Sequence, residues 1–210
     1  MPEYDSAAGL TAVEVASKRP SSHVTRERIL NSAAHSFARA GYNGTSLDEI
    51  ASRAGISKAG LLYHFRSKRE LLDTLLAERD EHNAWEFDQE ALPLETIDSF
   101  RDVAANDIAH PTITRAFAVL LGESVALDSP VTDWFRQRYH DLEEQLRVAL
   151  AEAVHEGQIS GDFNAGEIAA EVIAVMDGLQ IQWLLSGDDQ AYLARLEGYL
   201  DRLLDWLVNR

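Results

Sequence analysis

The chain has 210 residues and a mass of 23.3 kDa, which is long enough for one large domain or two small ones around a sizeable apolar core. Hydrophobic residues make up 46% and charged residues 26%, so the composition excludes a disordered chain and a fibrous repeat. The formal net charge is −16. Taken as a single value, this charge argues against a nucleic-acid partner, because the phosphates would repel the protein.

The sequence contains no cysteine, which excludes disulfides, thiolate metal sites and a cysteine nucleophile. The first 22 residues are small and polar, and they carry Glu3, Asp5 and Glu14 where a signal peptide would carry basic residues. Uninterrupted apolar runs such as 116–121 are far shorter than the roughly 20 residues that span a bilayer. We therefore expect a cytoplasmic protein with no membrane partner and a flexible arm over residues 1–22.

Helical periodicity follows this arm and continues to the end of the sequence. Apolar residues recur every three or four positions from Ile29 to Phe37, and Gly41 stands where a helix C-cap is expected. Residues 46–49 (Ser-Leu-Asp-Glu) and 67–70 (Ser-Lys-Arg-Glu) are capping boxes, which mark two helix starts. Their separation leaves room for only two short helices between them.

Residues typical of helix starts and ends also occur in the second half of the chain. Pro93 marks a helix start, and Ser129-Pro130 predicts an N-cap and first residue of a helix that runs to about Glu156 and stops at Gly157. Asn164 caps a further helix, and a last helix follows from about residue 190. Because alternating β-branched runs are absent, the sequence predicts an all-α fold of about nine helices.

The segment 46–65 has the spacing of a helix-turn-helix motif. Counting Leu47 as position 1, a small residue (Ala51) stands at position 5, a glycine (Gly55) at 9 and an apolar residue (Leu61) at 15. The small residue lets two helices approach, the glycine permits a positive φ in the turn, and the apolar residue fixes the second helix on the first. In such motifs the N-terminal end of the second helix meets base edges in the major groove.

The same spacing also occurs in helical hairpins that serve only packing, so the distribution of charge decides between the two interpretations. Residues 18–69 contain ten basic and three acidic residues, a net charge of +7, which leaves −23 for the rest of the chain. A basic unit with a helix-turn-helix beside an acidic helical body is typical of a DNA-binding protein with a separate sensing or assembly domain. The total charge of −16 conceals this separation.

Residues 25–81 resemble the DNA-binding domain of TetR-family transcriptional regulators. The resemblance rests on the run from Thr45 to Leu72, the Gly41-Tyr42 turn, the sequence Tyr63-His64-Phe65 and the Ser67-Lys68 pair. It implies an N-terminal three-helix bundle over residues 23–83, joined to a helical ligand-binding and dimerisation domain over residues 84–210. It also implies a homodimeric repressor that binds a palindromic operator in double-stranded DNA and is released by a small-molecule effector.

The resemblance further implies which residues contact DNA. Thr45 and Ser46 would contact phosphates at a helix N-terminus, and Lys58, Ala59 and Gly60 would face base edges. Tyr63, His64 and Lys68 would contact the backbone, whereas Phe65 is expected to pack inside the bundle. Many family members carry Thr or Asn where residues 59–62 read Ala-Gly-Leu-Leu, so direct readout here would rest on Lys58, groove shape and methyl contacts.

The last two helices are apolar around more than one face, which favours an interface of four helices from two chains over a thicker monomer core. The residues expected at this dimer interface are Val172, Leu179, Leu196, Leu200 and Leu203. A ligand pocket is expected where aromatic and polar side chains meet in the acidic body. Its expected lining is Phe117, Trp134, His140, Met176, Asp177, Gln180 and Trp183.

Other functions find less support in the sequence. No G-x-S-x-G, H-E-x-x-H, Walker or G-x-G-x-x-G motif is present, so we expect no enzyme and no cofactor. His140 and Glu144 could share a metal ion across one helix turn, but no third ligand follows at regular spacing, and we expect no metal site. The remaining alternative is a ligand-sensing adaptor of the same fold that acts through a protein partner without binding DNA.

Overall fold

The computed structural model describes residues 22–82 and 93–209, and their regular structure is entirely helical. Ten helices lie within these ranges, close to the expected nine: α1 Ser22–Ala40, α2 Leu47–Arg53, α3 Lys58–His64, α4 Lys68–His82, α5 Pro93–Asp98, α6 Phe100–Ala109, α7 Pro111–Ser124, α8 Thr132–His155, α9 Ala165–Ser186 and α10 Asp189–Asn209. The predicted arm, except its last residue, and the predicted domain boundary at 83/84 lie outside the described residues.

The helix-turn-helix geometry predicted from the sequence is present in the structure. Ser46 caps α2 by accepting the Glu49 N–H at 3.1 Å, and Ser57 caps α3 by accepting the Gly60 N–H at 3.1 Å. Gly55 in the turn has a φ of +67°. Only half of the first capping box forms, because the Glu49 carboxylate instead pairs with Arg39 at 2.5 Å.

The start of α8 differs from the prediction. The helix begins at Thr132 with Val131 as its N-cap, two residues after the expected first residue Pro130. The chain reverses at Asp128, which has a φ of +59°, and the Thr132 hydroxyl donates to the Ser124 carbonyl at 2.6 Å. These contacts hold the chain in a turn until Thr132, so the proline serves the turn rather than the helix. The predicted start at Pro93, the Asn164 cap and the stop at Gly157 are confirmed.

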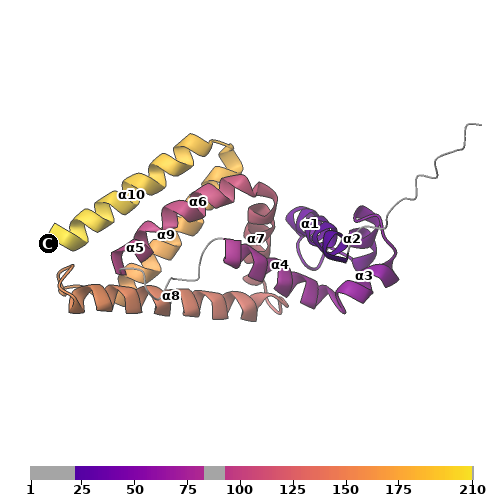
Figure 1. Ribbon diagram of the computed structural model, residues 1–210, viewed down its shortest axis with the longest axis horizontal. Helices are drawn as coiled ribbons and strands as arrows, with labels where there is room; N and C mark the ends of the chain where they lie inside the picture. The colour runs from indigo at the N-terminus through magenta and orange to yellow at the C-terminus, as the bar shows by residue number, and fades with distance from the viewer. Residues whose placement is uncertain (1–21, 83–92, 210) are drawn as a thin grey trace, which may run out of the picture.

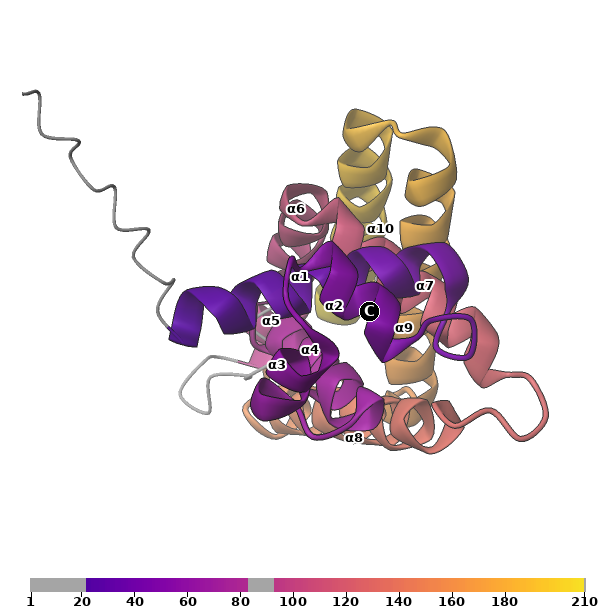
Figure 2. The same cartoon turned by 90° about the vertical axis from the view of Figure 1, so that its right-hand side faces the viewer.

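The molecule is elongated, with α1–α3 at one end and the C-terminus of α10 at the other (Figure 1). The helices α4 and α7 lie between these ends, and the view along the long axis shows α1 crossing in front of the body (Figure 2). We call α1–α4 the head and α5–α10 the body.

Two apolar clusters form the interior. The first joins the head to the body, because Phe37, Leu61 and Leu72 of the head share it with Phe117 and Phe135 of α7 and α8. The second lies wholly in the body, between α5, α6, α8, α9 and α10. The head is therefore packed directly against α7 rather than tethered to the body.

Among the described helices, α9 is long and apolar enough to cross a membrane by length and composition. It does not stand out as an apolar run in the sequence because Glu167, Glu171 and Asp177 interrupt it. One side of α9 packs in the second cluster, through residues such as Ile173 and Trp183. Another part of its apolar surface, including Ile181 and Leu185, is exposed in the single chain.

Candidate functional site

The recognition helix α3 is fixed on its inner side and open on its outer side. Leu61 and Phe65 are completely or almost completely buried, which confirms the packing role expected for Phe65. Tyr63 is 83% exposed, and its ring meets that of His64 edge to face at 5.3 Å. The first turn also lies outward, with Lys58 half exposed. This short helix can therefore reach into a groove without disturbing its own packing.

Lys58 has a partner in the free protein. Its ammonium lies 2.8 Å from Oδ2 of Asp48 on α2, and both side chains are largely exposed to solvent. An exposed ion pair of this kind contributes little to stability and exchanges readily for a stronger partner. It does, however, hold the Lys58 side chain beside the first turn of α3.

The two phosphate contacts expected at the start of α2 have hydroxyl groups that are already engaged within the head, and one of them faces inward. Thr45 is 3% exposed, and its hydroxyl lies 2.7 Å from the Gly41 carbonyl oxygen and 3.1 Å from that of Ser36. Its side chain is thus a brace inside the head, which corrects the role that the resemblance implied. Ser46 is exposed, but its hydroxyl caps α2.

Lys68 also braces the head. Its ammonium donates to the carbonyl oxygens of Tyr42 and Thr45, each at 2.7 Å, and lies 4.2 Å from the centre of the Tyr42 ring. Burial lowers the pKa of Lys68, although the negative charge of Glu123 acts in the opposite direction. The side chain remains partly exposed, so the carbonyl contacts hold an ammonium at the edge of the head rather than deep inside it.

The residues expected to form a ligand pocket do not all meet. Met176, Asp177 and Gln180 line one cavity of about 20 Å³ together with Arg79 and Arg138, a volume that holds about one water molecule. The other expected residues are placed elsewhere: Phe117 is buried in the first cluster, Trp134 lines a groove on α4 and α8, His140 is exposed, and Trp183 stacks on Tyr192.

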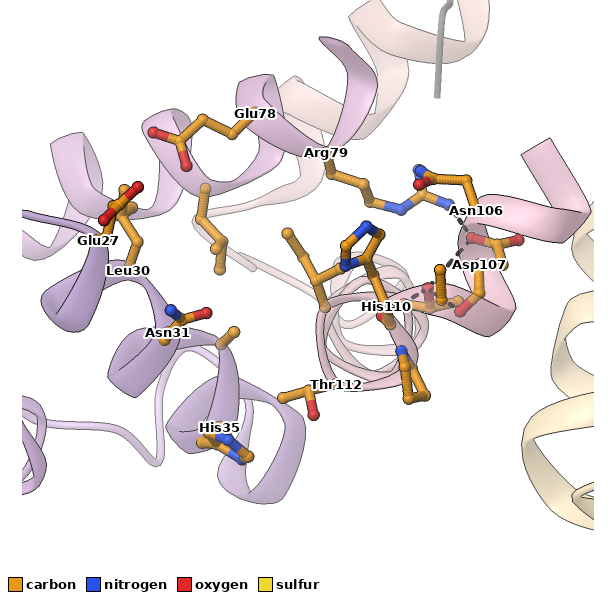
Figure 3. A pocket seen from close by; sticks show the side chains of 16 residues that line it. Glu27, Leu30, Asn31, His35, Glu78, Arg79, Asn106, Asp107, His110 and Thr112 are labelled. Atoms are coloured by element: carbon orange, nitrogen blue, oxygen red, sulfur yellow. Dashed lines mark hydrogen bonds and ion pairs between the residues drawn. The ribbon is translucent and has the colours of Figure 1, made fainter. Parts of the chain in front are cut away.

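A larger cavity of about 580 Å³ lies where the head meets the body (Figure 3). Its lining includes Asn31 and His35 from α1, Arg79 from α4, and His110 and Thr112 at the start of α7. The imidazole of His110 points into the middle of this space. Both the volume and the mixture of polar and apolar groups are usual for a small-molecule site.

Asp107 on α6 collects hydrogen bonds from several helices beside this cavity. One carboxylate oxygen accepts from Gln180 at 2.7 Å and from Tyr192 at 3.0 Å, and the other accepts from Thr114 at 3.1 Å. The guanidinium of Arg79 lies 3.5 Å from the same carboxylate and stacks 3.8 Å from the centre of the Phe117 ring. Gln180, expected to touch ligand, is thus engaged with Asp107.

Sequence reasoning missed Arg79, Asp107 and Glu123, although the first two left a signal. Arg79 continues the apolar face of α4 that runs through Leu72 and Leu75, and Asp107 continues the face of α6 that runs through Phe100 and Val103. A charged residue in the register of a core face indicates a buried polar contact, since a buried charge is costly unless it is paired. Glu123 showed no comparable pattern.

Exposure also corrects the expected dimer interface. Val172, Leu196, Leu200 and Leu203 are buried within the single chain, so they pack in its own core; Leu179 is partly exposed. The exposed large apolar residues on the same two helices are Ile181, Leu185, Leu193, Trp206 and Val208.

Comparison with known proteins agrees with this architecture. The family described as bacterial regulatory proteins, tetR family, matches residues 29–75, and the C-terminal family of BetI-type transcriptional repressors matches residues 100–205. The HTH-type transcriptional regulator TtgR of Pseudomonas putida is 30% identical over 191 residues, which cover 87% of this chain and 91% of that protein.

Solved structures share the fold. A TetR transcriptional regulator from Chloroflexus aurantiacus J-10-FL superposes with a TM-score of 0.72 at 23% identity, covering 89% of this chain and 96% of that one. A transcriptional regulator from Saccharomonospora viridis in complex with choline gives 0.64 at 23% identity, covering 87% and 96%. With the family matches over both halves of the chain, these findings show that the protein belongs to the TetR family of bacterial transcriptional regulators.

Proposed function

We propose that this regulator is a homodimeric repressor that binds a palindromic operator through α3 and leaves it when a small molecule binds. The observation that carries the DNA contact is the outward first turn of α3, where Lys58, Ala59 and Gly60 precede the exposed Tyr63. The N-terminal part of a recognition helix is the part that meets base edges. His64, beside Tyr63, is proposed as a backbone contact. Thr45 is proposed to act only through its main chain, while Ser46 and Lys68 remain proposed contacts at the rim of this surface.

A single head reads only one half-site, so the proposal needs two heads related by a two-fold axis. The exposed apolar residues of α9 and α10 supply a surface for that pairing, since an apolar face without an intrachain partner favours association. Two recognition helices can then enter successive major grooves about 34–36 Å apart.

We place the effector in the 580 Å³ cavity between α1, α4, α6 and α7. Because its walls belong to both head and body, an occupant that fits only one relative position of the two would change the affinity for DNA by the ratio of its affinities for the two states. The expected pocket residues Met176 and Asp177 lie next to it across Arg79, which borders both cavities. The regulator from Saccharomonospora viridis that shares this fold was solved in complex with choline, which supports a small organic molecule as the class of effector.

A cytoplasmic, non-enzymatic role completes the proposal. The family consists of regulators that act on DNA, and the sequence carries none of the catalytic motifs considered above.

The experiment that tests DNA binding starts from a randomised pool of duplexes, from which the wild-type protein selects its own site. Recovery of an enriched palindrome, bound more weakly by Lys58→Ala, is the expected result. If no duplex is enriched at low salt, the regulator proposal fails and the adaptor alternative gains. Any compound that releases the selected DNA is then tested on Thr112→Trp, which fills the cavity; equal sensitivity of the variant would contradict the placement of the effector.

A further inference from the structure

Glu123 near the end of α7 reaches out of the body to the main chain of the head. Its Oε2 accepts the Tyr42 N–H at 2.6 Å, and its Oε1 accepts the Asn43 N–H at 3.0 Å. Both amides belong to the turn of residues 41–45, which connects α1 to the N-cap of α2. Hydrogen bonds to an ionised acceptor are about twice as strong as neutral ones, so this contact is a firm junction between the two parts.

The turn is shaped to receive this carboxylate. Gly41 has a φ of +66°, and a Cβ at this position would lie 2.6 Å from the Glu123 Oε2. Only glycine therefore gives both the backbone conformation and the space for the acceptor. The turn also has carbonyl oxygens that accept hydrogen bonds, and Lys68 donates to two of them, those of Tyr42 and Thr45.

A carboxylate from the body and an ammonium from α4 thus hold the same turn through its N–H and carbonyl groups. The turn ends at Thr45, and the next residue, Ser46, is the N-cap of α2, which is followed by α3. We propose that Glu123 is a positioning residue for DNA binding, through which the body orders this turn and sets the N-terminus of α2 in its DNA-competent position. The inference rests on the DNA contacts proposed above, and Glu123 itself touches no DNA in it.

Charge and position predict opposite effects at this residue, which makes the inference testable. Glu123 adds a negative charge beside a surface that must approach phosphates, so electrostatics alone predicts that Glu123→Gln tightens DNA binding. If the residue orders the turn, the same change weakens binding. A turn that is competent about a tenth of the time lowers the apparent affinity about tenfold.

The experiment measures the Kd of wild-type protein, Glu123→Gln and Glu123→Ala for the duplex selected by the wild type, well below the unfolding temperature of each. Asp128→Asn is the matched control, because it removes one exposed negative charge five residues away and Asn tolerates the positive φ found there. We expect about tenfold weaker binding for Glu123→Gln, a larger loss for Glu123→Ala, and unchanged or slightly tighter binding for the control.

Two further readouts separate positioning from a general loss of stability. Hydrogen exchange at the Tyr42 and Asn43 amides should become faster in Glu123→Gln, while that of the α1 core amides stays the same. The dependence of affinity on salt should keep its wild-type slope, because no phosphate contact is removed. If the wild type binds the duplex and Glu123→Gln binds it equally well or more tightly, this inference is overturned. If the wild type itself does not bind, the DNA-binding proposal is overturned instead.

Discussion

The hydroxyl of Tyr139 on α8 donates a hydrogen bond to Oδ2 of Asp177 on α9, inside the body of the protein. Burial is the main influence on this carboxyl and raises the pKa of Asp177, while the Tyr139 hydrogen bond and the charge of Arg138 act to lower it. Burial also raises the pKa of Tyr139, so the phenol remains the donor. The pair therefore prefers a protonated Asp177 more than an aspartate in water does.

This preference predicts a dependence of stability on pH. Because the pKa of Asp177 is higher in the folded than in the unfolded chain, the folded state gains stability below the ordinary Asp pKa of about 3.9 and loses it as the pH rises through the folded pKa. Asp177→Asn keeps a neutral acceptor for Tyr139 and removes this loss. Urea unfolding from about pH 4 to about pH 7 should show the variant gaining on the wild type as the pH rises. A constant difference across that range would contradict the shift.

The ion pair between Lys58 and Asp48 leads to a prediction on selectivity. Asp48→Asn frees the ammonium and removes a negative charge from the DNA-facing surface, so binding to random duplexes should tighten several-fold at low salt. Lys58→Ala should weaken binding to the selected duplex by about 1–3 kcal/mol. Both effects are measured by competition titration at two salt concentrations.

The control for this prediction is Asp205→Asn on α10, which removes the same charge near the C-terminus, at the far end of the molecule from α3 (Figure 1). It should leave both affinities unchanged, because screening makes a distant charge ineffective. If Asp205→Asn tightens nonspecific binding as much as Asp48→Asn does, net charge rather than the local pair is responsible.

Because Arg79 and Asp107 form a buried ion pair, we predict that removing one of the two charges strongly destabilises the folded protein. Both side chains are almost completely buried, and burial lowers the pKa of Arg79 against the opposing effect of Asp107. Asp107→Asn removes the buried carboxylate and leaves the guanidinium only the partly exposed Asp80, 3.4 Å away, which should lower the free energy of unfolding by about 3 kcal/mol. Urea unfolding measures this loss.

Glu144→Gln supplies the comparison, because its ion pair with Arg147 lies on the exposed side of α8. Exposed pairs contribute little, so this variant should unfold at the wild-type urea concentration. Similar small changes in the two variants would show that the Asp107 contacts are worth no more than a surface pair.

Local signals in the sequence predicted much of the head. The spacing of Ala51, Gly55 and Leu61 identified the helix-turn-helix because each position answers a steric requirement that only a few residues meet. Capping residues such as Ser57 and Asn164 worked for the same reason, since their side chains act within three residues.

Contacts between distant segments could not be predicted from the sequence. A helical wheel shows that Leu200 and Ile181 are both apolar, but only the packing of α9 against α10 shows that Leu200 is enclosed and Ile181 remains exposed. Lys68 is equally ambiguous, because a lysine at a helix start suits a phosphate as well as the two carbonyl oxygens that it meets here. The resemblance implied that Lys68 contacts the DNA backbone, and in the structure of the free protein its ammonium contacts these two carbonyl oxygens.

The exposed apolar face of α9 and α10 gives the prediction on assembly. Ile181 is 43% exposed in the single chain, so Ile181→Glu should leave the fold intact. In the proposed dimer the new carboxylate would be buried without a partner, at a cost that separates the subunits at micromolar concentration. Sedimentation equilibrium should report the monomer mass, with an unchanged circular dichroism spectrum.

Leu127→Glu is the matched control, because Leu127 is an apolar residue that is 97% exposed in the turn before α8. It should remain dimeric.

The two variants should also differ in DNA binding. Ile181→Glu should keep its affinity for an isolated half-site but lose the additional affinity that a dimer has for the full palindrome, because linking two binding modules raises avidity without any new contact. A dimer that survives Ile181→Glu would move the interface away from this face, whereas a monomer that still prefers the full palindrome would show that the two heads pair on the DNA itself.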